Sequence, residues 1–266
     1  FRQFNHNRLT FSLMYAYSEN FILVISHDEV VHLKCSMINK MPGLHDDKFA
    51  NLRTAYGFMY GHPGKKLLFM GQEFAQLREW SGARSLDWYL LDGEDAASHK
   101  GIQNYVKALN HLYNTYDAFY YNDQDQMGFE WISCDDPQSS IVSFIRRGST
   151  AKDQLLFVCN FTPVDRDGFV VGVPCPGKYT EILNSDAEEF GGKGRVNAKP
   201  VKAENEPWNG REQSITMHLP PLSVVVFRYD DVEKKQPVKA LPKQGTAKTS
   251  ATKSTTAKKS MPKKSK

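Results

Sequence analysis

Long apolar runs and paired cysteine motifs are both missing from this chain of 266 residues. No apolar stretch reaches the roughly 18 residues that a transmembrane helix needs, so the sequence argues against a membrane span. The four cysteines are Cys35, Cys134, Cys159 and Cys175, and no CxxC pattern occurs among them. Their spacing gives no support to zinc or thioredoxin-like chemistry, and it predicts buried free thiols in a reducing, cytoplasmic compartment.

A large excess of charge is lacking as well, except at one end of the chain. The formal net charge is +4, from 34 Lys and Arg against 30 Asp and Glu. Residues 231–266 alone contain 11 lysines and two acids, which leaves 23 basic and 28 acidic side chains in residues 1–230. The body of the protein is therefore mildly acidic, which argues against a nucleic-acid-binding core.

Aromatic residues are absent from residues 231–266, which consist mainly of Lys, Ser, Thr, Ala and Pro. Such a segment cannot bury enough apolar surface to offset the entropy of ordering, so we predict a disordered Lys-rich tail. A second interpretation is that the tail is a weak electrostatic tether to an anionic partner such as nucleic acid.

The first 115 residues alternate between short apolar runs and helical periodicity. Apolar runs cover 21–25 and 67–70, and apolar residues recur at helical spacing over 46–60 and 101–115. Short apolar runs bounded by polar residues are typical of strands buried on both faces of a parallel sheet. The order strand, helix, strand, helix predicts a βαβα arrangement.

Residues 116–230 carry only short alternating or apolar runs, separated by turn residues. These runs are 129–132, 141–145, 155–159, 169–171, 179–183 and 223–227. The pattern predicts an antiparallel β-sandwich, with 191–209 as a long surface loop. The predicted fold class is therefore α/β plus all-β, divided into residues 1–115, 116–230 and 231–266.

The sharpest feature of the sequence is the stretch SHDEVVH at 26–32. His27 and Asp28 follow the first apolar run, and Gln72 and Glu73 follow the second. In a (β/α) barrel the carboxyl ends of the strands meet at one rim, so these side chains are predicted to face one site. Carboxylates there suit chemistry that develops positive charge, such as an oxocarbenium-like sugar. Alternatively, His27 and Asp28 only cap the next helix or form a structural pair.

The stretch ISHDEVVH at 25–32 resembles the fourth conserved region of the alpha-amylase superfamily of glycoside hydrolases. Further stretches are similar to the bacterial 1,4-alpha-glucan (glycogen) branching enzymes within it: KFANLR at 48–53, PGKKLLFMGQEFAQ at 63–76, REW at 78–80, SLDW at 85–88, GFEW at 128–131, NFTPV at 160–164 and LPPL at 219–222. The resemblance covers residues 1 to about 230. It implies that 1–115 is the C-terminal part of a (β/α)8 catalytic barrel and 116–230 a C-terminal β-sandwich.

The resemblance also implies roles for the residues of the first cluster. Asp28 would stabilise the transition state by hydrogen bonding the hydroxyls of a distorted sugar ring, and His27 would bind the same sugar. Glu29 and His32 would support this geometry from the rim. The substrate would be an alpha-glucan, either glycogen or a linear maltooligosaccharide, and no metal or organic cofactor is implied.

The second cluster has implied roles too. Gln72 and Glu73 would lie beyond the last barrel strand, next to the substrate. Trp80 and Trp88, in the loop that follows, would stack on the faces of glucose units. The alternative for both tryptophans is packing within the core of the loop.

Two departures from the family pattern stand out. A retaining enzyme of this type needs a nucleophilic Asp and an acid/base Glu, which come from earlier barrel strands in the family. Only residues 1–20 precede the first apolar run, and the chain begins with Phe, so we expect a C-terminal fragment that is inactive alone. Leu33 is the second departure, because branching enzymes usually have Gly there, in a His-Gly-Lys sequence.

A complete enzyme of this family would cleave alpha-1,4 glucan through a covalent glycosyl-enzyme and transfer the chain to a 6-hydroxyl. The sequences EVVH at 29–32 and QEFAQ at 72–76 favour this function over an alpha-amylase-type or trehalose-releasing hydrolase. A third interpretation is a non-catalytic glucan-binding module, which the missing carboxylates favour for the chain by itself. Two barrel strands alone are also expected to leave apolar faces uncovered.

Overall fold

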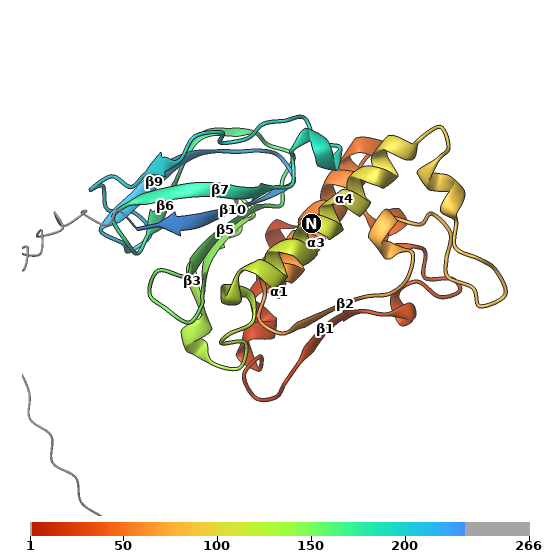
Figure 1. Cartoon of the computed structure of the whole chain (residues 1–266), viewed down its shortest axis with the longest axis horizontal. Helices are drawn as coiled ribbons and strands as arrows, with labels where there is room; N and C mark the ends of the chain where they lie inside the picture. Colours follow the sequence, from red (N-terminus) through yellow and green to blue (C-terminus); the bar gives the residue numbers. More distant parts are fainter. Residues whose placement is uncertain (1, 232–266) are drawn as a thin grey trace, which may run out of the picture. The chain divides into compact units, whose positions relative to one another are not determined.

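A computed structural model describes residues 2–231 of the chain (Figure 1). Two parallel strands and two long helices form the first part of the chain. Strand β1 (Ile22–Ile25) pairs in parallel with β2 (Lys65–Leu68), and α3 (His45–Gly61) lies between them in the sequence. Helix α4 (Ala96–Thr115) follows. The predicted order of strand, helix, strand and helix is confirmed, although β2 and α4 both begin earlier than expected.

Local sequence explains both ends of α3. Asp46 and Asp47 occupy the first turn of α3, where negative charge interacts favourably with the helix dipole. The helix ends at Gly61, before Pro63, because a proline lacks the backbone N–H and restricts the residue before it. The remaining short helices of this part are η1 (Gln3–Asn5), α1 (Arg8–Phe11), η2 (Ser12–Met14), η3 (His27–Glu29), α2 (Met37–Lys40), η4 (Gln72–Phe74) and η5 (Trp88–Leu91).

The second part consists of antiparallel sheets, as predicted. Six strands form one sheet in the order β3-β4-β5-β10-β7-β8, and β6 pairs with β9 in a second sheet. Their bounds are β3 (Phe129–Asp136), β4 (Ile141–Arg147), β5 (Gln154–Asn160), β6 (Arg166–Val173), β7 (Lys178–Asn184), β8 (Val201–Lys202), β9 (Gln213–Leu219) and β10 (Ser223–Asp230). Short helices η6 (Asp117–Phe119), η7 (Gln126–Gly128) and η8 (Glu188–Phe190) lie in the connections.

Strands β8 and β9 were not predicted from the sequence. The short β8 lies within the expected loop 191–209, and β9 supplies half of the smaller sheet. A signal for β9 is present, because Ile215, Met217 and Leu219 alternate with more exposed residues and are all buried. This period of two is typical of a strand with one face in the core.

Both faces of the large sheet are covered, which explains its continuous apolar runs. Phe157 of β5 packs into a core shared with α3 and α4, whereas its neighbour Val158 packs into a core shared with β6 and β9. Every residue of β5 is buried. Helices, large sheet and small sheet are therefore three successive layers, because successive side chains of a strand point to opposite faces.

The parallel pair β1 and β2 differs from the prediction that both of its faces are buried. Ile22 and Val24 are 57% and 51% exposed, and Leu67 is 40% exposed. Ile25 and Leu68 face the other way and pack against the core under α3. The described residues cover only one face of this pair, in agreement with the expectation that an isolated pair of barrel strands leaves an apolar face bare.

The two parts of the chain are joined by a buried arginine. Arg146 of β4 donates hydrogen bonds to the carbonyl oxygens of Gly61 and Phe119, each at 2.9 Å, and to Oδ1 of Asp123 at 2.7 Å. Its side chain is fully buried, and the surrounding apolar core draws on both parts. Residues 2–231 belong to one compact unit. The boundary predicted between residues 115 and 116 stays a prediction.

The remaining expectations from composition have mixed outcomes. All four cysteines are free, as predicted, but only Cys159 is buried and Cys35 is exposed. The prediction of buried thiols was therefore wrong for Cys35, which lies in an irregular loop rather than in a strand or helix. Among residues 2–231, none of the helices is both long enough and apolar enough to cross a membrane. The predicted disordered tail lies outside the described residues, apart from Asp231.

Candidate functional site

A tight helical turn begins where β1 ends, and it carries His27 and Asp28. Ser26 caps this turn, since its Oγ accepts a hydrogen bond of 3.1 Å from the backbone N–H of Asp28. The side chains of His27 and Asp28 are 52% and 68% exposed, with Nε2 of the imidazole 3.4 Å from Oδ1 of the carboxylate. Oδ2 of Asp28 also accepts a hydrogen bond of 3.3 Å from Oγ of Ser26, and both side chains remain more than half exposed.

An aromatic cluster lies beside His27. The centroid of its ring is 5.9 Å from that of Phe69 and 6.1 Å from that of Trp80, which contact each other edge to face at 5.2 Å. The backbone N–H of Trp80 donates to the carbonyl of Val30 at 2.8 Å, which holds the second loop against the first. The structure thus brings together residues that lie more than fifty positions apart in the sequence.

Gln72 links the ends of β1 and β2 to α3 through buried hydrogen bonds. It is only 4% exposed, and its Nε2 donates to the carbonyl oxygen of Ile25 at 3.1 Å. The backbone carbonyl oxygen of Gln72 accepts a hydrogen bond of 3.0 Å from the buried hydroxyl of Tyr56 on α3. Glu73 is half-buried in the same turn. Gln72 therefore fixes the end of β1 relative to the end of β2.

Glu29 and His32 contact charged side chains outside the aromatic cluster. Oε2 of Glu29 lies 3.7 Å from Nζ of Lys40 in an ion pair. Nδ1 of His32 lies 3.9 Å from Oε2 of Glu79, and the imidazole is 88% exposed. Glu29, at the end of η3, and His32, in the loop after it, are therefore each paired with a charged side chain.

Glu79 is a functional candidate that the sequence analysis missed. Its carboxylate accepts hydrogen bonds from the backbone N–H groups of Cys35 at 2.7 Å and Leu33 at 3.1 Å. These bonds lower the pKa of Glu79, with the bond from Cys35 as the largest cause. Leu33 and Cys35 both have left-handed backbone, with φ of +67° and +63°. The family resemblance points to Gly at position 33, and this conformation is the one that glycine favours.

The two tryptophans of the second cluster differ in their surroundings. Trp80 is half-buried beside His27, whereas Trp88 stacks on Phe74 with ring centroids 5.1 Å apart and remains 51% exposed. One face of Trp88 is therefore used for packing, as the alternative interpretation expected, while a large part of its surface stays open.

A polar hollow of about 500 Å³ opens next to Trp80. It is lined by the side of the loop that carries Arg78, Glu79 and Arg84, with serines at its edge. Asp87 anchors this loop, since its buried carboxylate accepts a hydrogen bond of 2.8 Å from Nε of Arg78. An aromatic wall with donors and acceptors around it can hold a polyhydroxylated ligand. Within residues 2–231, no group of three His, Cys, Asp or Glu side chains is arranged to hold a metal ion.

Comparison with known proteins agrees with this architecture. Residues 131–230 match the family described as the alpha amylase, C-terminal all-beta domain. The catalytic module of the multi-modular glycogen-degrading pneumococcal virulence factor SpuA has the same fold, with a TM-score of 0.55 at 13% identity over 85% of this chain and 39% of that module. The family match and the shared fold both fall on an all-β domain like the one that residues 129–230 form here.

Closer relatives narrow this assignment. The chain is 52% identical over 227 residues to the 1,4-alpha-glucan branching enzyme GlgB of Bacillus caldolyticus, covering 85% of this chain and 34% of that enzyme. It is 48% identical over 228 residues to the same enzyme of Halothermothrix orenii, covering 86% and 36%. The chain spans about a third of the length of these relatives.

Proposed function

We propose that this chain supplies the C-terminal part of a 1,4-alpha-glucan branching enzyme of glycogen biosynthesis. Such an enzyme cleaves alpha-1,4 chains and transfers them to 6-hydroxyls, forming alpha-1,6 branches. The observation that carries the proposal is the exposed His27–Asp28 pair at the end of β1, beside Trp80. Identity of about one half to proteins named as branching enzymes supports it.

The contacts within the site suggest a different role for each of its residues. Asp28 would accept hydrogen bonds from sugar hydroxyls and hold the ring near the distorted transition state, with His27 bound to the same sugar. Trp80 would stack on a neighbouring glucose. Gln72 would act as a positioning residue, because it is buried against the backbone at the end of β1.

The remaining candidates would act at the rim of the same site. Glu29 and His32 would hold the loop after β1, since each is engaged by a charged neighbour rather than by the aromatic cluster. Glu73, half-buried next to Gln72, would face the glucan from the second strand. Trp88 would contact a more distant glucose with its exposed surface.

The bare face of β1 and β2 supports the assignment of residues 1–115 to a larger barrel. Ile22, Val24 and Leu67 expose apolar surface of the kind that neighbouring barrel strands cover. The nucleophilic Asp and the acid/base Glu would come from such strands, outside this chain. We therefore expect the isolated chain to bind alpha-glucan without turning it over.

Co-sedimentation of the whole chain with glycogen, together with an iodine-absorbance assay for branching, tests this proposal. We expect wild-type chain to sediment with glycogen and to leave the iodine absorbance unchanged. His27→Ala and Trp80→Ala should each weaken sedimentation several-fold, whereas Tyr121→Ala, a change at an exposed aromatic residue outside the site, should not. Robust branching by this chain, or equal binding by all three variants, would contradict the proposal.

We also propose a cytoplasmic location for the protein. The four free thiols, one of them exposed at Cys35, are compatible with a reducing compartment. The ligand expected there is glycogen or a linear maltooligosaccharide. Cell fractionation that recovers the protein from an oxidising compartment would contradict this.

A further inference from the structure

A hollow lies where the N-terminal segment, the turn between α2 and α3, and the β-sheet part of the molecule meet. It measures about 350 Å³, within the range of roughly 300–1,000 Å³ that is typical of small-molecule pockets. All three segments line this junction hollow, among them with Arg2, Leu9, Lys40, Met41, Ala55 and Phe161. None of the described residues that line it is a candidate residue of the glucan site, so the two sites are separate.

Hydrogen bonds between distant segments hold the walls of the junction hollow in place. Nε2 of His6 lies 2.9 Å from the backbone carbonyl oxygen of Cys134 on β3, and it is the donor because a carbonyl oxygen only accepts. The backbone N–H of Phe161 donates to the carbonyl oxygen of Ser140 at 3.1 Å. The ring of Phe161 contacts Phe58 of α3 edge to face, with centroids 5.5 Å apart. The fold itself therefore builds the hollow, and a ligand would not have to order its walls.

Most of the wall of the junction hollow is apolar. Leu9, Met41 and Phe161 are half-buried and pack against the core under α3. Ala55 of α3 also lines the hollow, and its short side chain leaves the space open. Aliphatic, thioether and aromatic groups around one concavity suit a ligand with a flat apolar body.

Within residues 2–231, every charged side chain that lines the junction hollow is cationic. Nη2 of Arg2 donates a hydrogen bond of 2.5 Å to Oδ1 of Asn51, whose own amide nitrogen donates to two backbone carbonyl oxygens. Burial lowers the pKa of Arg2, and no acidic residue in the described part of the chain opposes this effect. Lys40 differs, because its Nζ lies 3.7 Å from Oε2 of Glu29.

Arg2 therefore carries a partly buried charge that no carboxylate of the described residues compensates. A guanidinium has several N–H donors, of which Asn51 engages one, and a carboxylate can accept two of them at once. A neutral apolar ligand would leave the charge of Arg2 uncompensated, and a sugar would place hydroxyls against the apolar wall. The groups of the hollow thus match a ligand that is apolar over most of its surface and anionic at one end.

We propose that the junction hollow binds a small organic anion with a flat apolar body and one carboxylate. The carboxylate pairs with Arg2, and the apolar body packs against Leu9, Met41 and Phe161. Such a ligand differs chemically from a glucan, so this site goes beyond the proposed function and does not depend on it. Because the hollow joins three segments of the folded chain, occupancy should stabilise the chain against unfolding.

Calorimetric titration of the whole chain with naphthoate tests the junction hollow. Naphthamide, which has the same apolar body without the charge, should bind at least about tenfold more weakly than naphthoate. Acetate, which has the charge without the body, should not bind measurably. Arg2→Met should weaken the binding of naphthoate about tenfold and bring naphthoate and naphthamide to similar affinities.

Two further variants locate the ligand. Arg8→Met changes an exposed arginine of the same N-terminal segment that does not line the hollow, and it should bind naphthoate as the wild-type chain does. Ala55→Leu places a larger side chain in the hollow and should weaken the binding of naphthoate and naphthamide alike, by at least about tenfold. Unfolding curves in urea check that each variant is folded.

Several outcomes would overturn the junction hollow as an anion site. One is equal affinity of the wild-type chain for naphthoate and naphthamide, and another is equal affinity of the wild-type chain and Arg2→Met for naphthoate. Binding that Ala55→Leu leaves unchanged would place the ligand elsewhere, and absence of binding by the folded wild-type chain would refute the site outright. None of these results bears on the rim at the end of β1, because the probes are not sugars.

Discussion

The parallel strand β1 and the central antiparallel strand β5 arise from similar apolar runs, yet their environments are opposite. All seven residues of β5 are buried, since α3 and α4 cover one face of the sheet and β6 and β9 cover the other. In β1, Ile22 and Val24 are more than half exposed, whereas Ile25 packs against the core.

This contrast shows what an apolar run specifies. It indicates a strand that requires cover on two faces, but it does not indicate which part of the molecule supplies the cover. The described residues supply both covers for β5 and only one for β1. We expect the remainder of the proposed barrel to cover the bare face of β1. Four predictions test or sharpen the difference between β5 and β1.

The largest expected effect is a core truncation in β5 compared with one on the bare face of β1. Phe157→Ala should lower the free energy of unfolding by about 3–5 kcal/mol, because the ring is fully buried and stacks on Phe144 at 4.9 Å. Val24→Ala, at a half-exposed residue, should cost about 0.5 kcal/mol. Urea unfolding of both variants measures the difference. Similar costs would show that the face of β1 is covered in the folded chain.

The next largest loss of stability is expected at Arg146, which joins the two parts of the chain. Arg146→Met should cost about 3 kcal/mol, since the buried carbonyl oxygens of Gly61 and Phe119 lose this donor and the carboxylate of Asp123 loses its shorter charged contact, keeping that from Nζ of Lys65 at 3.3 Å. Arg147→Met changes the same residue type one position along, where the side chain is 31% exposed, and should cost much less. Two separate unfolding transitions in Arg146→Met would sharpen the comparison further, whereas an unchanged midpoint would show that this arginine does not hold the regions together.

A smaller, pH-dependent effect comes from His62 at the same joint. Burial, with help from the charges of Lys66 and Arg146, lowers the pKa of His62 from 6.5 to about 3. Between these values the unfolded chain binds the proton and the folded chain does not, so stability is lost as the pH falls below about 6.5, at no more than about 1.4 kcal/mol per pH unit.

His62→Gln should remove this contribution and flatten the decline in unfolding free energy between pH 6.5 and pH 5 by roughly 2 kcal/mol. The measurement is urea unfolding at a series of pH values. His111→Gln, at an exposed histidine on α4, is the matched control and should keep the wild-type slope. Equal slopes in both variants would argue against a buried, neutral His62.

The smallest effect concerns the loop after β1. Leu33 is 84% exposed and has φ of +67°, a conformation that costs a non-glycine residue roughly 1–2 kcal/mol. Leu33→Gly should therefore raise the free energy of unfolding by about 0.5–1 kcal/mol, because the added freedom of the unfolded chain offsets part of the gain. Leu33→Ala keeps the strain and should change little. A loss of stability in Leu33→Gly would mean that the leucine side chain has contacts in solution that offset its strain.

The candidate rim was predictable because its residues follow strands that the sequence marks clearly. His27 and Asp28 come directly after an apolar run, and parallel strands place such residues at one edge. The buried role of Gln72 and the hold of Glu79 on the loop were not predictable, because both depend on backbone groups more than forty residues away in the sequence.

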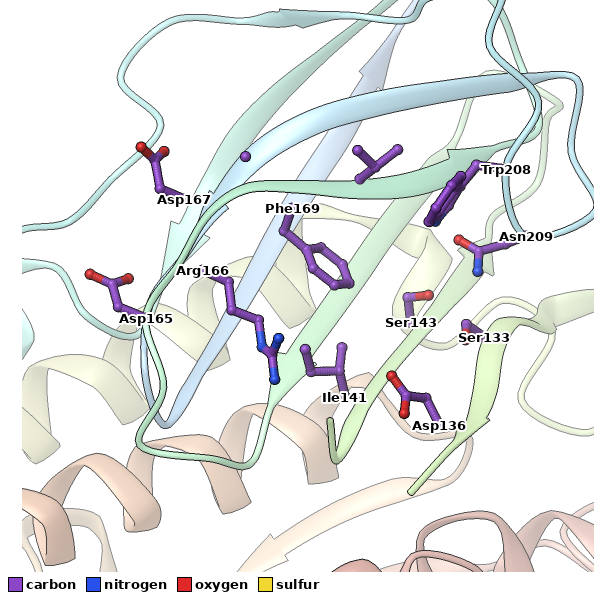
Figure 2. Close-up of a pocket in the computed structure, with 12 residues that line it drawn as sticks. Ser133, Asp136, Ile141, Ser143, Asp165, Arg166, Asp167, Phe169, Trp208 and Asn209 are labelled. Atoms are coloured by element: carbon purple, nitrogen blue, oxygen red, sulfur yellow. The ribbon is translucent and has the colours of Figure 1, made fainter. Parts of the chain in front are cut away.

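By itself, the sequence determined the order of strands and helices, the change from a parallel pair to antiparallel sheets, and the end of α3 before Pro63, because these depend on local periodicity and backbone chemistry. Only the tertiary structure decided which faces are covered and where hollows remain. A hollow on the β-sheet part of the molecule is lined by Ser133, Phe169 and Trp208, which no local sequence pattern connects (Figure 2). It exists because a two-stranded layer is too narrow to cover a six-stranded one.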